Sequence, residues 1–410
     1  MLVYIGIDWS QKKHDLCFLN QAGARLAEQT IPHTQTGFSQ LDVVREKLGL
    51  ELTDCIIGLE TAHNILLDYL WDQGYPQVYV LPPNRVKSSR GRFRQSRART
   101  DLSDAWLIAD ILRTDLARLQ PWAPDSSLTQ QIRSRVNYVQ LMTKEIVRLT
   151  NYQRAILLRY YPVAADLFSG LKTLIAQHFI RTFPAPETTK DLDLETFQTF
   201  ARQHAYTRPE KLPATLAKLH QVHPIASSET VETFQSQAQS LARLLLPMIR
   251  AKRTALRELN NLFLQHPDHF IYASLPGAGD FLRPALLSKF GDHRYRFPSA
   301  SRVQAVAGTC PVTISSGKYK SIRFRYACDH QFRQIVQQWA KASLTSSVWA
   351  NAYYSRVRPR CDSDNHAYRC LANRWLAVLW RLWQDRKPYD ETYHLQQRTL
   401  RSQPREIMTV

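Results

Sequence analysis

The chain has 410 residues, of which 44% are hydrophobic, so it is long and apolar enough for two or three domains with buried cores. Its 54 Lys and Arg residues outnumber 35 Asp and Glu residues, and the net charge of +19 indicates a polyanionic partner. It contains no stretch long enough for a transmembrane helix, no signal peptide and no CxxC pair. These features exclude membrane-spanning and disulfide-rich secreted classes and predict a cytoplasmic protein with reduced thiols.

The N-terminal region alternates between short apolar strands and helices. Strands are expected at residues 3–8, 14–20, 27–32, 54–60 and 77–81, and helices at 37–48 and 64–71. A further helix is expected from residue 101, with Thr100 as its N-cap. This order predicts an α/β domain with a mixed sheet, in which the first and fourth strands lie side by side and helices cover the faces.

Four acidic residues stand where these elements would converge. Asp8 and Glu60 end the first and fourth strands, and Asp101 and Asp104 share one face of the last helix. Taken singly, each acid is better explained as a helix-cap, turn or strand-end charge. Together they would repel one another without a cation, and Mg²⁺ prefers oxygen ligands. The four residues therefore predict a two-ion Mg²⁺ site of the kind that cleaves phosphodiesters.

A basic stretch leads into this helix and contains no acidic residue. Its members are Arg85, Lys87, Arg90, Arg92, Arg94, Arg97 and Arg99. Such a run beside a metal site is predicted to hold a nucleic-acid backbone.

Three N-terminal motifs, GIDWS, GLETAHN and RTDLSDA, together carry a family resemblance. They closely resemble bridge-RNA-guided insertion-sequence transposases, which are DEDD recombinases with a RuvC-like, RNase-H-like N-terminal domain and are related to pilin-gene DNA invertases. The resemblance places the family's metal-binding tetrad on Asp8, Glu60, Asp101 and Asp104. The usual Lys-Thr-Asp-x-x-Asp-Ala begins with Arg99 here, which preserves the charge.

The resemblance implies three regions: a RuvC-like catalytic domain at 1–121, a helical coiled-coil linker at 122–266 and a C-terminal domain at 267–410. From residue 231, apolar residues recur at three- and four-residue spacing, which indicates a coiled coil, a helical hairpin or helices of a globular core. Pro247 must kink this segment or begin a second helix. Residues 162–227 show no recognisable chemistry.

Two features of the C-terminal region suggest contact with nucleic acid. Gly277 and Gly279 precede a helix and resemble a helix-hairpin-helix element that offers backbone N–H groups to phosphate, although a tight packing turn explains them equally well. Further along, a basic run follows a Ser-Ser-Gly turn. It consists of Lys318, Lys320, Arg323 and Arg325.

Ser316 matches the nucleophilic serine of the family, whereas Ser315 occupies a position that varies in it. A serine hydroxyl needs a base or a metal to activate it, and the sequence shows no His-Asp partner. Elsewhere in this region, Cys361, His366 and Cys370 are loosely spaced, and this spacing does not predict a zinc site.

The resemblance therefore implies an RNA-guided DNA recombinase that uses a serine nucleophile and Mg²⁺. Its expected partners are donor DNA, target DNA, a noncoding bridge RNA and further copies of the chain, as a dimer or a synaptic tetramer. A RuvC-like junction nuclease without a serine intermediate is the main alternative. A non-catalytic nucleic-acid-binding protein is less well supported because all four acids are present.

Overall fold

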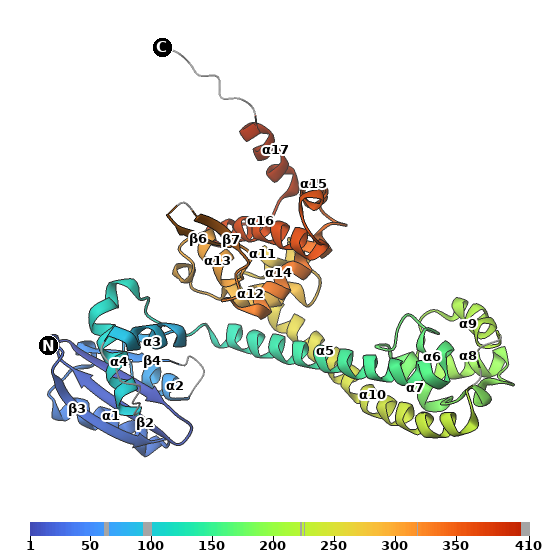
Figure 1. Ribbon diagram of the computed structural model, residues 1–410, viewed down its shortest axis with the longest axis horizontal. Helices are drawn as coiled ribbons and strands as arrows, with labels where there is room; N and C mark the ends of the chain where they lie inside the picture. The colour runs from blue at the N-terminus through green and yellow to red at the C-terminus, as the bar shows by residue number, and fades with distance from the viewer. Residues whose placement is uncertain (61–64, 93–100, 222–223, 225, 318, 403–410) are drawn as a thin grey trace, which may run out of the picture. The chain divides into compact units, whose positions relative to one another are not determined.

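The computed structural model describes residues 1–60, 65–92, 101–221, 224, 226–317 and 319–402 (Figure 1). Internal contacts divide the chain into two compact units, Met1–Pro124 and Asp125–Val410. Among the described residues, no helix combines the length and the apolar character needed to cross a membrane.

The first unit is built on a five-stranded sheet with the order β3-β2-β1-β4-β5. The strands are β1 (Val3–Trp9), β2 (Lys13–Leu19), β3 (Arg25–Pro32), β4 (Cys55–Leu59) and β5 (Val78–Val80). The first three strands are antiparallel, while β4 runs parallel to both β1 and β5. The expected mixed sheet, with the first and fourth strands adjacent, is confirmed.

Helices cover both faces of this sheet. They are α1 (Gln35–Lys47), α2 (Ile65–Asp72), α3 (Pro83–Ser89) and α4 (Asp101–Asp115). Because side chains alternate along a strand, Ile5 and Ile7 of β1 pack with α1 and α2, whereas Tyr4 packs with α4. The sequence did not predict α3; Pro83 at its start favours a helix by fixing φ.

Helix α4 approaches β1 closely at Gly6. A Cβ atom added there would lie 1.9 Å from the carbonyl oxygen of Ala105 and 2.5 Å from the amide nitrogen of Ala109. On the neighbouring strand, a Cβ at Gly58 would lie 2.8 Å from Leu112 Cδ1. Two glycines therefore create the groove in which α4 lies.

Two long antiparallel helices, α5 (Ser127–Tyr160) and α10 (Ser228–Gln265), organise the second unit (Figure 1). The start of α5 packs with the end of α10, and the end of α5 packs with the start of α10. The segment from residue 231 is thus part of one long helix that packs against α5, rather than a hairpin of its own. Helix α10 continues through Pro247, so the alternative of a second helix beginning there is wrong.

A small helical subdomain joins the far ends of this pair. Its helices are α6 (Pro162–Ala165), α7 (Leu174–Thr182), α8 (Leu194–Gln203) and α9 (Leu212–Leu219). Phe179 and Phe197 are fully buried in its core, together with residues from α5 and α10. The segment that showed no recognisable chemistry therefore forms a packed element.

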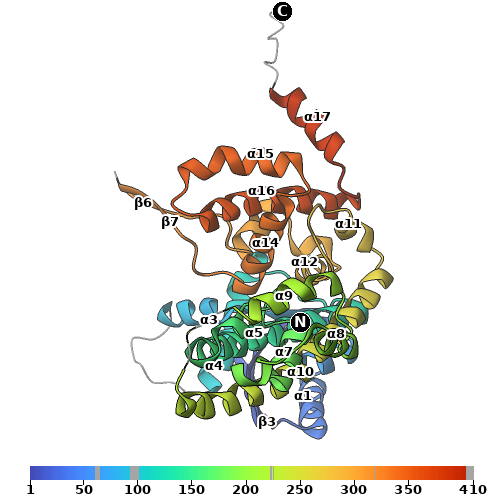
Figure 2. The ribbon, with the colours of Figure 1, turned by 90° about the vertical axis from the view of Figure 1, so that its right-hand side faces the viewer.

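The other end of the pair belongs to the C-terminal core. Its elements are α11 (His269–Ala273), α12 (Leu282–Phe290), α13 (Ala300–Val306), β6 (Val312–Ser316), β7 (Tyr319–Arg323), α14 (His330–Ser343), α15 (Val348–Val357), α16 (Asp364–Asp385) and α17 (Glu391–Ser402). Trp339, Trp375 and Trp383 are fully buried, as expected for core residues. The antiparallel β6–β7 hairpin extends away from these helices (Figure 2).

The groove at Gly6 gives a test of the packing. We expect Gly6→Ala to lower the free energy of unfolding by at least about 3 kcal/mol, because the added methyl group meets backbone atoms that cannot rotate away. Gly91→Ala is the matched control: its added Cβ meets no atom within 4 Å, and we expect a change within about 0.5 kcal/mol. Denaturant unfolding measures both. Equal effects of the two substitutions would contradict the close approach of α4.

Candidate active site and nucleic-acid interface

Asp8 and Glu60 lie at the same end of the sheet on adjacent strands. In the parallel β1–β4 ladder Ile7 is aligned with Leu59, so Asp8 and Glu60 take up the next positions along the two chains. Asp8 and Glu60 each come two residues after a glycine, Gly6 and Gly58, that faces α4. Side chains two residues apart in a strand lie on the same face, so both carboxylates also face α4. The strand order thus places two carboxylates beside each other on the face that α4 covers.

Helix α4 brings a third acid to this end. Ala105 of α4 lies over Gly6, two residues before Asp8, and Asp104 is its neighbour in the chain. The charge of Asp104 also acts on Glu60, which places the first turns of α4 at the strand ends. Asp101 begins α4, but its side chain is outside the part of the chain that the structure describes, as is Thr100, the expected N-cap.

The charge of Asp104 acts on Glu60. Burial raises the pKa of the Glu60 carboxyl, the negative charge of Asp104 raises it further, and the positive charge of Arg90 opposes both effects. The guanidinium of Arg90 donates a hydrogen bond to Asp104 Oδ2 at 2.7 Å. A cation thus already neutralises part of this acidic group.

These residues fit a divalent cation. Their donors are carboxylate oxygens from separate elements, and a cation would offset both the burial and the charge of Asp104 that raise the pKa of Glu60. Asp8, Glu60 and Asp104 are all half-buried rather than solvent-exposed, so the charges are incompletely screened by water.

The described members of the basic stretch lie in different environments. Arg85 forms an ion pair with Asp115 at 3.3 Å, and Arg90 pairs with Asp104, whereas Lys87 is exposed. The side chains of Arg92, Arg94, Arg97 and Arg99 lie outside the described residues. Sequence reasoning assigned Arg90 to nucleic acid and missed its contact with a predicted metal ligand, because the two residues are fourteen positions apart and share no repeating pattern.

Ser315 and Ser316 end strand β6 and are exposed. Ser316 pairs with Tyr319 across the hairpin, and Gly317 adopts a φ of 56°, which a turn residue without a side chain tolerates. Among the described residues, no histidine or carboxylate forms a hydrogen bond with the Ser316 hydroxyl.

The basic residues after the turn do not share one environment. Lys320 and Arg323 are exposed on β7, while Lys318 is outside the described residues. Arg325 instead donates hydrogen bonds to the carbonyls of Cys310 and Pro311, at 3.3 and 3.4 Å. It thus has a structural role at the base of the hairpin.

Phe324 anchors the hairpin to the helical core. The guanidinium of Arg333 in α14 lies 4.4 Å from its ring centroid, and that of Arg369 in α16 lies 4.7 Å from it. Such cation–π contacts contribute about 0.5–1 kcal/mol each at exposed sites. The β6–β7 hairpin is therefore exposed at the turn that follows Ser316 and attached to the helical core at its base.

The two glycines before α12 differ in what they contact. Gly277 adopts a φ of 70°, and a Cβ there would lie 2.5 Å from the backbone of Ala342 in α14. A Cβ at Gly279 would meet nothing within 4 Å. The packing-turn interpretation thus accounts for Gly277, and only Gly279 is open towards a ligand.

Comparisons with known proteins match both regions that contain candidate residues. A transposase model of the DEDD type from IS110 elements matches residues 5–162, and a model of the IS116/IS110/IS902 transposase family matches residues 271–355. The first match contains the four acids, and the second contains Ser316.

Full-length relatives agree with these matches. The mini-circle putative transposase for IS117 from Streptomyces coelicolor is 28% identical over 403 residues, which cover 95% of this chain and 96% of the relative. An uncharacterized 43.6 kDa protein of insertion element IS110 from the same organism is 23% identical over 400 residues, or 95% of each chain. The two matched regions together span more than half of this chain, and it therefore belongs to the IS110 family of transposases, enzymes that cleave and recombine DNA.

Proposed function

We propose that this transposase cleaves and exchanges DNA strands with Mg²⁺ held by Asp8, Glu60, Asp101 and Asp104 and with Ser316 as the nucleophile. The observation that carries the proposal is the convergence of Asp8, Glu60 and Asp104 at one end of the sheet. Adjacent parallel strands β1 and β4, with α4 lying over them, also support an RNase-H-like, RuvC-like assignment for this unit.

When bound, Mg²⁺ would supply positive charge to phosphate oxygens and lower the pKa of an attacking hydroxyl. The protein's part is to present half-buried carboxylates from three separate elements at one end of the sheet, where their side chains can converge on an ion. Arg90 offers a positive charge to Asp104 in the metal-free site. Binding of the metal would release that guanidinium towards a DNA phosphate, which it can contact through two donors.

In the proposed step, Ser316 Oγ attacks a DNA phosphorus atom. A bond forms between Oγ and phosphorus, the bond from phosphorus to one deoxyribose oxygen breaks, and that oxygen leaves as a hydroxyl. The serine proton passes to a base, and the leaving oxygen gains a proton. The exposed position of Ser316 at the end of β6 gives DNA access to it, and Lys320 and Arg323 on β7 provide positive charge nearby.

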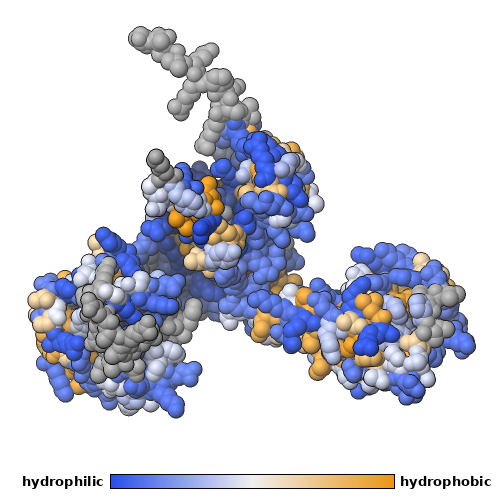
Figure 3. Space-filling model, in the orientation of Figure 1, coloured by the Kyte–Doolittle hydropathy of each residue, from blue (hydrophilic) through white to orange (hydrophobic). Residues whose placement is uncertain are grey.

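We further propose that a noncoding bridge RNA pairs with donor and target DNA and so determines the sites. The net charge of +19 supports a large polyanionic ligand, and base pairing would provide the sequence choice while the protein holds backbone and shape. The proposal includes a dimer or a synaptic tetramer. Exposed Leu141 and Leu244 on α5 and α10 support it, and Figure 3 shows hydrophobic surface along this helical pair.

A first prediction concerns Arg90. We expect Arg90→Gln to tighten Mn²⁺ or Mg²⁺ binding by about three- to tenfold, because it removes the cation that competes for Asp104. Arg113→Gln is the matched control, since Arg113 pairs with Asp110 on the same helix but outside the tetrad. Isothermal titration calorimetry measures both variants. Weaker binding by Arg90→Gln alone would mean that the guanidinium supports the metal site rather than competing for it.

A second prediction concerns the serine. We expect Ser316→Ala to abolish the covalent protein–DNA adduct and strand exchange, whereas Ser315→Ala retains both. The adduct is measured as DNA that stays with the protein in denaturing electrophoresis. Chelation of Mg²⁺ should remove the adduct from the unmodified protein. If Ser316→Ala still cuts DNA in a metal-dependent way, the enzyme acts as a nuclease through activated water.

A third prediction concerns the RNA. We expect protein purified from cells carrying the complete element to retain an RNA transcribed from the DNA that flanks the gene. Two of its loops should be complementary to donor and target sequences, and recoding one loop should redirect insertion accordingly. Ser316→Ala should retain the RNA, which separates binding from chemistry. Insertion that ignores the recoded loop would contradict RNA guidance even if the serine chemistry is correct.

A further inference from the structure

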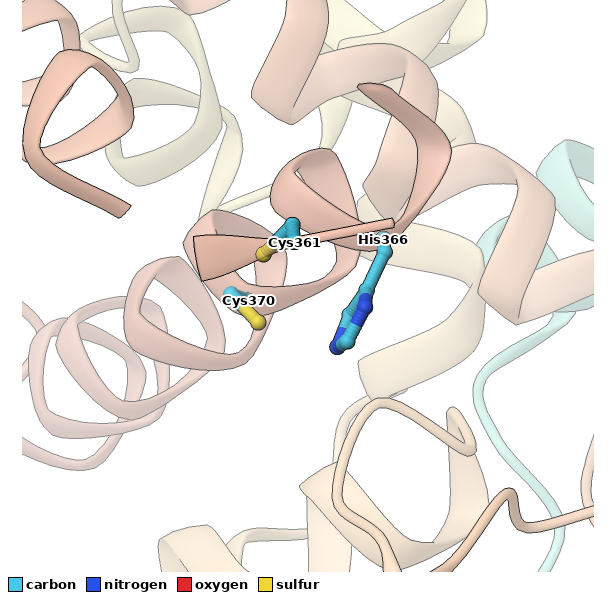
Figure 4. A group of neighbouring side chains, drawn as sticks. All are labelled: Cys361, His366 and Cys370. Atoms are coloured by element: carbon cyan, nitrogen blue, oxygen red, sulfur yellow. The ribbon is translucent and has the colours of Figure 1, made fainter. Parts of the chain in front are cut away.

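The C-terminal core brings together three potential metal ligands that are separate from the carboxylate group. The ligand atoms of Cys361, His366 and Cys370 all lie within 4.8 Å of one another. Figure 4 shows the three side chains around a common space at the start of α16. Among the described residues, this is the one such group of three or more His, Cys, Asp or Glu ligands.

Local folding explains why the loose sequence spacing still gives a compact group. Ser363 caps α16 by accepting a hydrogen bond from the amide of His366, so the helix begins at Asp364. His366 and Cys370 are then four positions apart in the first turns and share one face. Cys361 precedes the cap, and its carbonyl accepts a hydrogen bond from Arg358 at 3.0 Å, which holds the loop against the helix.

The ligand types select the metal. Two thiolates and one imidazole are soft and borderline ligands that suit Zn²⁺, whereas Mg²⁺ requires oxygen. Around a tetrahedral Zn²⁺ with bonds of about 2.0–2.3 Å, ligand atoms lie about 3.4–3.8 Å apart. Small rotations of these partly exposed side chains would close the present separation to that range.

The charges nearby favour the same choice. Arg369 and Arg374 place positive charge near Cys370 and would repel a divalent cation on neutral ligands. Two thiolates cancel the charge of Zn²⁺, so the occupied site is neutral. Asp362 lies 3.6 Å from His366 Nδ1, and a carboxylate beside a ligand histidine orients the ring and raises its basicity.

We propose that Cys361, His366 and Cys370 bind one Zn²⁺, with a fourth position left for water or the Asp362 carboxylate. The ion would tie the loop before α16 to the helix that carries Arg369. Arg369 contacts Phe324 at the base of the β6–β7 hairpin, so the zinc site would stiffen the support of that hairpin. This inference does not depend on the proposed serine chemistry.

The test is metal analysis of the full-length protein purified in reducing buffer without chelator. We expect about one zinc per chain in the unmodified protein, and a loss of most of it in Cys361→Ser and in Cys370→Ser. Cys310→Ser is the matched control, because Cys310 is a similarly exposed free cysteine of the same unit outside the group. It should retain the zinc. Absence of zinc, or equal zinc in all variants, overturns the proposal.

A second measurement covers the case in which the cysteine variants fold poorly. After removal of zinc, unmodified protein titrated with Co²⁺ should develop the near-ultraviolet absorption of thiolate-to-cobalt charge transfer, and Zn²⁺ should displace it. Cobalt binding without that absorption places the ion elsewhere and overturns the site. A Cys361–Cys370 disulfide that persists in reducing buffer, detected as a mass lower by two hydrogens, overturns it as well.

Discussion

The close approach of helix α4 to strand β1 is the constraint on which the carboxylate group depends. The contact requires Gly6, because any side chain there would enter the backbone of α4 near Ala105. With the helix seated in this groove, its first turns lie at the strand ends where Asp8 and Glu60 are found. The acids come from three separate elements, and only this packing brings Asp104 to the other two. Hydrophobic burial on both faces of the sheet therefore offsets the cost of gathering like charges.

The sequence predicted the sheet because its signals are local and mutually consistent. Apolar runs marked the strands, and the succession of three strands followed by alternating helices and strands predicted adjacent first and fourth strands, as observed. The acids at strand ends then predicted convergence without any coordinates. The Arg90–Asp104 ion pair could not be predicted in this way, because it depends on how separate elements pack rather than on a repeating pattern.

The group of Cys361, His366 and Cys370 shows a different limit. Judged by spacing alone, it matched no familiar zinc motif. The spacing does not show where α16 begins. Because Ser363 caps the helix, His366 and Cys370 both lie in its first turns, four positions apart and on one face. The sequence does contain a capping serine followed by His and Cys at helical spacing. These residues predict a metal site only when the helix start and the ligand types are considered together.

The hairpin with Ser316 combines exposure with a fixed base. A two-stranded hairpin alone is marginally stable, and β6 and β7 are largely exposed, so the hairpin needs support from outside its own hydrogen bonds. This support lies just beyond the end of β7. The ring of Phe324 makes cation–π contacts with two guanidinium groups, and Arg325 donates hydrogen bonds to two backbone carbonyls. Because these contacts lie at the base, they leave the end of β6 accessible. The role proposed for Ser316 needs this division, because a buried serine could not reach a substrate as large as DNA.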